Sequence, residues 1–236
     1  MKKNIAIYLF FLVLAGDLIA IYFDNRDLQY AFKPLIILTL ILHLALQRGF
    51  SSNKLLRWIM IGLIFSWIGD VLLMFDDCDP IFFILGLLSF LLAHLFYIIF
   101  FHRVRVIENI KSNPWMLAAV VLYYAILIYF LSPFLGDMKL PVRIYGVVIS
   151  FMLMLALHML YIQNRRAGRT MLLGAILFVV SDSVLAFNKF YEPIQYGGLI
   201  IMTTYGIAQL LIVVGSVKMS GNGKNGVGGR VENHEK

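Results

Sequence analysis

Residues 55–75 read LLRWIMIGLIFSWIGDVLLMF, a run of twenty-one residues in which Arg57 and Asp70 are the charged ones. About 20 helical residues, at roughly 1.5 Å each, cross the hydrocarbon core of a bilayer, which is about 30 Å thick. The run lacks the period-two alternation that every strand of a transmembrane barrel needs. A helix is then the remaining way to satisfy the backbone in lipid. The stretch therefore predicts a transmembrane helix.

Seven further apolar runs extend this pattern along the 236 residues of the chain. The predicted spans are Asn4–Phe23, Ala31–Gln47, Leu55–Phe75, Ile81–Phe101, Trp115–Ser132, Val142–Tyr161, Thr170–Lys189 and Tyr196–Val217. With 61% hydrophobic and 14% charged residues, the chain has too little polar surface for a water-soluble domain of its size. We predict an all-α, multi-pass membrane bundle of about eight helices over residues 1–218, followed by a flexible, solvated tail over 219–236.

The twenty Lys and Arg residues predict the orientation of this bundle. Fifteen of them fall on the side of the chain termini and five on the other side, where Asp76, Asp77 and Asp79 have no basic neighbour in their loop. Cytoplasmic loops retain positive charge, so both termini are predicted to be cytoplasmic, at the inner membrane if the source is bacterial. The net charge of +7 reflects this topology, and no nucleic-acid partner is expected. An alternative is that the first span is a cleavable signal peptide.

Three acidic residues interrupt the predicted spans: Asp17, Asp70 and Asp182. An ionisable group inside a membrane helix costs free energy to insert, so it normally faces a polar cavity or a partner. Asp17 lies 13 residues beyond Asn4, Asp70 lies 13 beyond Arg57 and Asp182 lies 13 beyond Arg169, each on a helix that runs outward. This places all three at a similar depth, about 20 Å from the inner surface. We therefore expect acids on parallel helices to line one chamber, although each of them alone also fits a purely structural role.

The sequence around two of these acids repeats. Residues 62–75 align without gaps on residues 174–187, with a glycine eight residues before each aspartate, a leucine three after it and a phenylalanine five after it. The same offset of 112 residues pairs Gly86 with Gly198 in the following span. This pattern predicts an internal duplication of four helices, with the third helix of each half contributing one acid.

A set of residues spread over the whole chain resembles a known family. The set comprises Lys33-Pro34, Gly62, Gly69-Asp70, Gly86, His94, Tyr97, Ser181-Asp182, Ala186, Lys189, Tyr205 and Ala208-Gln209. In their order and placement, these residues resemble the YhhN-like lysoplasmalogenase membrane proteins. The resemblance implies a lipid hydrolase that cleaves the vinyl ether of lysoplasmalogens, giving a fatty aldehyde and glycerophosphoethanolamine or glycerophosphocholine. Its substrate would be a lysophospholipid or ether lipid, and no cofactor or metal is expected.

The resemblance marks Asp70 and Asp182 as the catalytic acidic pair, whereas Asp17 has no counterpart in it. A vinyl ether hydrolyses when its carbon end is protonated and water captures the resulting oxocarbenium ion. One protonated carboxyl and one carboxylate suit this chemistry, and two neighbouring carboxyls in an apolar environment can share a proton in this way. Which aspartate acts as the acid stays open.

Six further residues are expected to bind substrate: Lys33, Lys189, Tyr205, Gln209, His94 and Tyr97. The two lysines lie near the outer ends of their helices, where they could pair with the acids, hold a phosphate, or simply extend to the membrane interface. Tyr205 and Gln209 share a helix face and could orient water or a substrate oxygen, or form ordinary interhelical hydrogen bonds.

Three other functions stay open at this point. A three-histidine zinc site could draw on His43, His94, His102 and His158, although their depth differs from that of the aspartates. Repeated helices with intramembrane acids are also typical of proton- or ion-coupled transporters, here of a small amphiphile. The third alternative is a non-catalytic lipid-binding membrane protein. No Gly-x-Ser-x-Gly motif is present to suggest a serine hydrolase.

Overall fold

The computed structural model describes residues 2–47 and 49–222, and eight α-helices make up most of this part of the chain. They are α1 Lys2–Tyr22, α2 Arg26–Ala45, α3 Lys54–Leu73, α4 Pro80–Ile107, α5 Pro114–Leu131, α6 Lys139–Leu157, α7 Arg165–Phe190 and α8 Gly197–Asn222. Each contains a segment long and apolar enough to cross a membrane. The predicted all-α bundle of eight spanning helices is confirmed.

Five of the helices begin at a side-chain cap rather than where the apolar run begins. The capping residues are Asn25, Asn53, Asp79, Asn113 and Asn164, and each accepts a hydrogen bond from a backbone N–H of the first turn. Such caps satisfy donors that the helix itself leaves unpaired. Hydropathy alone placed the start of α2 at residue 31 and of α7 at residue 170, five residues too late in both cases.

Several helices are longer than the bilayer requires. The 28 residues of α4 extend to Ile107, so Arg103 and Arg105, which were expected in a loop, lie on its last turns. A helix of this length spans about 42 Å, and the charged turns can therefore project beyond the hydrocarbon core. In the same way α8 continues through the first four residues of the predicted tail, and residues 223–236 lie outside the described part of the chain.

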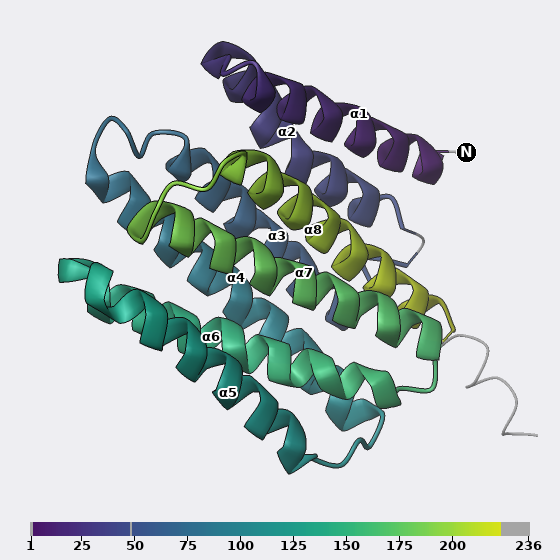
Figure 1. Ribbon diagram of the computed structural model, residues 1–236. Coiled ribbons are helices and arrows are strands. Elements are labelled where there is room, and N and C mark those ends of the chain that lie inside the picture. Colours follow the sequence, from purple (N-terminus) through teal and green to yellow (C-terminus); the bar gives the residue numbers. More distant parts are fainter. Residues whose placement is uncertain (1, 48, 223–236) are drawn as a thin grey trace, which may run out of the picture.

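The helices are arranged with α1 and α5 at opposite edges of the bundle and with α3, α4, α7 and α8 between them (Figure 1). Burial agrees with this arrangement, because half of the spanning segment of α8 is buried in the protein, compared with 17% for α5. The closest helix pairs are α3 with α4 and α7 with α8, each joined by a short loop. These two pairs carry the repeated aspartate segments.

Several acidic residues lie in short loops at one end of the bundle. This end, called the acidic end below, holds the α1–α2 turn with Asp24, the α3–α4 loop with Asp76, Asp77 and Asp79, and the last turn of α7. Ion pairs join these segments: Arg26 binds Asp77, and Lys189 Nζ lies 2.8 Å from Asp76 Oδ2. The functional groups described next lie between the acidic end and the middle of the bundle.

Candidate functional site

A cavity of about 70 Å³ lies inside the bundle, enclosed by residues of α2, α3, α4, α6, α7 and α8. Its polar lining residues are Lys33, Asp70, Tyr145, Ser181, Asp182 and Tyr205. Apolar side chains, among them Phe83, Leu87 and Phe90 of α4, form much of the remaining wall. We refer to this space as the aspartate cavity. Four of the eight residues proposed from the sequence lie in its wall: Lys33, Asp70, Asp182 and Tyr205.

Each aspartate of the cavity is hydrogen-bonded to a tyrosine from another helix. The Tyr205 hydroxyl on α8 donates to Asp70 Oδ2 on α3 across 2.7 Å, and the Tyr145 hydroxyl on α6 donates to Asp182 Oδ2 on α7. Asp70 is 3% exposed, and the side chain of Asp182 is 13% exposed. The two carboxyls are therefore held in fixed orientations in one small, mostly apolar space.

Tyr145 was missed by the sequence reasoning, although the repeat contains a signal for it. A single tyrosine in an apolar helix is common and carries no functional indication by itself. The offset of 112 residues that relates Asp70 to Asp182 also relates Lys33 to Tyr145, and both of these residues line the aspartate cavity. Applying the offset to every polar residue of the first half would have found Tyr145.

Glycines allow the helices beside the site to approach closely. A Cβ atom on Gly174 of α7 would lie 2.8 Å from the backbone oxygen of Ala208 on α8. A Cβ atom on Gly62 of α3 would likewise overlap the ring of Tyr97 on α4. These glycines stand eight residues before Asp182 and Asp70, so a close contact precedes each acid at the corresponding position of its helix pair.

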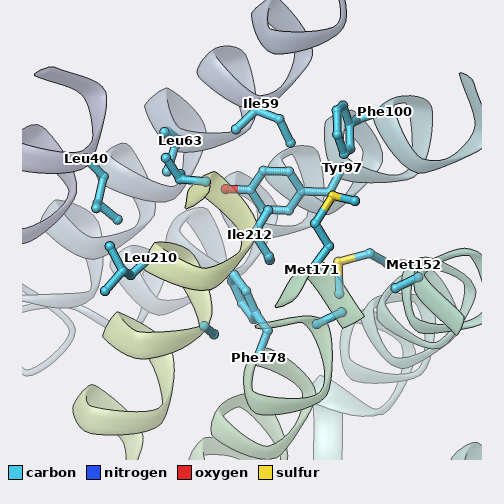
Figure 2. Packing of buried hydrophobic residues seen from close by; sticks show 14 of the residues in the cluster. Leu40, Ile59, Leu63, Tyr97, Phe100, Met152, Met171, Phe178, Leu210 and Ile212 are labelled. Carbon is cyan, nitrogen blue, oxygen red and sulfur yellow. The ribbon is translucent and has the colours of Figure 1, made fainter. Parts of the chain in front are cut away.

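Tyr97 and Gln209 lie deeper in the bundle, in a separate hydrogen-bonded group. The Tyr97 hydroxyl donates to Gln209 Oε1 across 2.7 Å, and Gln209 Nε2 donates to Ser66 Oγ across 2.9 Å. Figure 2 shows the Tyr97 ring within the hydrophobic cluster that also contains Ile59 and Phe100. The three polar side chains are buried and are not among the residues that line the cavity. Their position suits a role in fixing α3, α4 and α8 relative to one another.

His94 approaches the aspartate cavity from α4. Its Nε2 atom lies 3.9 Å from Asp182 Oδ2, which is beyond hydrogen-bond distance, and its side chain is fully buried. The imidazole packs edge-on against the rings of Tyr145 and Phe178. His94 is therefore a neighbour of Asp182 in the bundle interior.

The two lysines occupy different places. Lys33 lies in the wall of the aspartate cavity together with Asp70. Lys189 is at the acidic end, where it pairs with Asp76 and lies 5.0 Å above the ring of Phe83. The structure thus brings Lys33, but not Lys189, to the aspartates.

The histidines considered for a zinc site are spread through the bundle. His43 is hydrogen-bonded with Gln47, and His158 contacts the backbone of Asn113 and Met154. Within residues 2–47 and 49–222, no three His, Cys, Asp or Glu side chains gather in a way that could hold a metal ion.

Asp17 on α1 is a third buried acid near this region. It is fully buried, and in the described part of the chain neither of its carboxyl oxygens has a hydrogen-bond partner. Asp17 does not line the aspartate cavity.

Comparison with known proteins gives the family. A family model described as the YhhN family matches residues 28–216, which cover α2 to α8 almost completely. The chain belongs to the YhhN family. It is an integral, multi-pass membrane protein, as its eight apolar helices also indicate. The match begins after α1, so Asp17 lies outside it, whereas all eight residues proposed from the sequence lie within it.

Several relatives of this YhhN-family chain are named lysoplasmalogenases. Human lysoplasmalogenase TMEM86A is 34% identical over 163 residues, covering 68% of this chain and 65% of the relative. Human lysoplasmalogenase TMEM86B is 34% identical over 161 residues, covering 66% of this chain and 62% of the relative. The chain thus spans slightly less than two thirds of these two proteins, while it covers 72% of rat lysoplasmalogenase TMEM86B at 32% identity. No solved structure matches the chain.

Proposed function

We propose that this chain hydrolyses the vinyl ether bond of lysoplasmalogens, releasing a fatty aldehyde and glycerophosphoethanolamine or glycerophosphocholine. Asp70 and Asp182 act as its catalytic acid and base. The observation that carries the proposal is that these two carboxyls, from α3 and α7, line one small cavity inside the membrane. The name shared by the relatives supports the choice of substrate class.

The reaction needs one acid, one base and one water molecule. The protonated carboxyl transfers its proton to the carbon of the vinyl group that is distal to the ether oxygen, and the carbon bonded to oxygen becomes an oxocarbenium ion. Water adds to that carbon and gives a proton to the other carboxylate. The product of this addition is a hemiacetal. The second carboxyl, now protonated, gives its proton to the glycerol oxygen as the bond between that oxygen and the hemiacetal carbon breaks. The first carboxylate takes the proton of the hemiacetal hydroxyl, which becomes the aldehyde carbonyl. One water molecule is consumed and both carboxyls return to their starting state.

The two tyrosines keep each carboxyl in a fixed position for these transfers. Tyr205 and Tyr145 each bind the Oδ2 atom of an aspartate, which leaves Oδ1 as the oxygen for substrate or water. General acid and base groups must reach the reacting atoms directly or through one water molecule. A buried carboxyl with only one fixed partner satisfies this requirement, because its second oxygen can still face the cavity.

The volume of the cavity implies a change of shape during the reaction. A space of about 70 Å³ has room for a few water molecules but is far too small for a lysolipid. Phe83, Leu87 and Phe90 of α4 form part of its wall and must move when the vinyl ether reaches the aspartates. The mostly apolar wall limits the water around the two carboxyls, which suits a reaction that passes through an oxocarbenium ion.

Release of aldehyde tests the proposal directly. Protein purified in detergent should release fatty aldehyde from a lysoplasmalogen, but not from the matched lysolipid with a saturated 1-O-alkyl ether, which lacks the double bond to be protonated. Transport of the intact lipid into sealed vesicles without aldehyde release would support the transporter alternative instead. Tight binding with neither reaction would support a lipid-binding protein.

A further inference from the structure

A second cavity, of about 180 Å³, opens at the acidic end next to the aspartate cavity. Its charged lining residues are Asp24, Arg26, Lys33, Asp76 and Asp77, and Gln29 and Tyr30 add further polar groups. We refer to this space as the charged cavity. In contrast to the mostly apolar aspartate cavity, it is lined largely by groups that can bind a charged ligand.

Lys33 lies in the walls of both cavities. Two other cations of this region already have partners, because Arg26 pairs with Asp77 and Lys189 pairs with Asp76. Within residues 2–47 and 49–222, no carboxylate lies within 4.0 Å of the Lys33 ammonium group. A half-buried lysine at the boundary of two cavities is therefore available to an anionic group of a ligand.

The remaining groups of the charged cavity can accept hydrogen bonds from a cation. Asp24, at the turn after α1, contributes a carboxylate to the wall, and Asp76 and Asp77 contribute two more. Pro34 has no backbone N–H, so the carbonyl of Tyr30, four residues earlier, lacks its usual helical donor. Because Asp77 is paired with Arg26 and Asp76 with Lys189, Lys33 and Asp24 are the charged lining groups without an ion pair in the described part of the chain. One cation and one carboxylate favour a ligand that carries both signs of charge over one that carries only negative charge.

The two cavities match the layout of a lysophospholipid. In such a lipid the phosphate and the ether oxygen are bonded to the two outer carbons of glycerol, and the amine of ethanolamine or choline lies two carbons beyond the phosphate. A phosphate near Lys33 would place the ether bond on the side of the aspartate cavity and the amine on the side of the charged cavity. The positions of Asp70, Lys33 and Asp24 follow the order of the vinyl ether, phosphate and amine along the lipid.

We propose that the charged cavity binds the zwitterionic head group of the lysolipid, with Lys33 holding the phosphate and the carboxylate of Asp24 facing the amine. The identity of the ligand as a lysolipid rests on the function proposed above. The new elements are the place of the head group and the residues that select it. Lysolipids with a phosphoethanolamine head group should bind more tightly than those with phosphoglycerol, which has the phosphate but no amine.

Binding measurements with lipids that cannot be hydrolysed test this site apart from catalysis. The probes are two 1-O-alkyl lysolipids with the same chain, one with phosphoethanolamine and one with phosphoglycerol, titrated against purified protein in detergent. Lys33→Gln should weaken the binding of both at least tenfold, and Lys33→Arg should restore most of it. Asp24→Asn, which leaves both ion pairs of the region intact, should reduce the preference for phosphoethanolamine at least fivefold. Asn suits the left-handed backbone at position 24, where φ is 49°, so this change should not disturb the turn.

Matched controls come from the same end of the bundle. Lys139→Gln and Asp137→Asn change exposed residues near the start of α6 that line neither cavity, and they should leave both affinities unchanged. An unaltered head-group preference in Asp24→Asn, with its folding verified by Tm, would overturn the proposal. So would unchanged phosphate-dependent binding in Lys33→Gln. If the predicted affinity changes appear but no aldehyde forms from a lysoplasmalogen, the head-group site stands and the hydrolase proposal fails.

Discussion

Tyr205 on α8 and Asp70 on α3, separated by 135 residues in sequence, form a hydrogen bond of 2.7 Å in the interior of the bundle. Tyr145 on α6 makes the same type of bond to Asp182 on α7. Both tyrosines and both aspartates line one cavity, and these four residues come from α3 in the first half of the chain and from α6, α7 and α8 in the second half. Substitutions at these four positions should therefore separate catalysis from packing.

Asp70→Asn and Asp182→Asn should each lower lysoplasmalogen turnover by about 10² or more, the usual contribution of acid–base catalysis. Asn has nearly the same shape but carries neither the negative charge nor the acid proton, so the folded bundle should persist. The double variant should be little worse than either single one, because losses within a cooperating pair are not additive. Turnover and Tm are measured on all three variants. Activity that falls only in step with Tm would favour a structural role for the aspartates.

Tyr205→Phe and Tyr145→Phe should lower kcat about tenfold with a small change in KM. Each removes one hydroxyl that orients a carboxyl and leaves a buried acceptor without its partner, while the ring packing is kept. Steady-state kinetics on the two variants checks this. Tyr129→Phe, at a tyrosine that is 78% exposed on α5, provides the control and should behave like the unmodified protein. A rise in KM with unchanged kcat would instead indicate that the tyrosines contribute to substrate binding.

Asp17→Asn should keep turnover within about tenfold and should leave Tm equal or higher. The carboxyl is fully buried and has no hydrogen-bond partner in the described part of the chain, so it costs stability when charged. It also does not line the aspartate cavity. Parallel assays with Asp70→Asn give the comparison. A loss of activity as large as that of Asp70→Asn would place Asp17 in the catalytic group.

Gly174→Ala should lower Tm, because the added methyl group would lie 2.8 Å from the backbone oxygen of Ala208 and α7 would have to move away from α8. Overpacking of this kind costs about 1–3 kcal/mol. The matched change Gly221→Ala, at a helical glycine with open space around the added atom, should leave Tm unchanged or slightly raised. Thermal melts of both variants in one detergent make the comparison. Equal Tm values would show that the close contact between α7 and α8 is not needed.

The positive-inside distribution predicts that a reporter fused after Lys236 is cytoplasmic and that one inserted between Asp76 and Pro80 is external. Paired reporters that are active on opposite sides of the membrane measure this in cells. The reverse pattern would place the acidic end, and with it the charged cavity, at the cytoplasmic leaflet, and the lysolipid would then have to enter from inside the cell.

Hydropathy predicted the eight helices because the thickness of a bilayer imposes a minimum length on every spanning segment. It did not predict where α2 and α7 begin, because Asn25 and Asn164 extend both helices through polar residues that hydropathy excludes. Helix ends outside the hydrocarbon are decided by capping and by contacts between loops. These are local interactions that an average over a span does not detect.

The aspartate pair could be expected from the sequence, because an ionisable residue inside a membrane costs free energy and normally faces a polar cavity or a partner. Tyr145 could not be selected on the same basis, since a tyrosine is tolerated in many membrane helices without any specific partner. Likewise, Lys33 and Lys189 look equivalent in sequence, and only the packing of the helices separates the one in the cavity wall from the one at the acidic end. The depth of a side chain can be estimated from sequence, whereas the helix face it occupies depends on tertiary contacts.

The ion pairs at the acidic end are more exposed to solvent than the tyrosine–aspartate hydrogen bonds. Arg26 and Asp77 are 60% and 57% exposed, and Lys189 and Asp76 are 40% and 25% exposed. Ions in solution screen charges over about 8 Å at physiological ionic strength and over shorter distances at higher salt. Together these pairs connect the start of α2 and the end of α7 to the α3–α4 loop. Added salt should therefore loosen the loops around the charged cavity while the buried carboxyls keep their partners, so ionic strength should change how readily a lipid enters without changing the chemistry that follows.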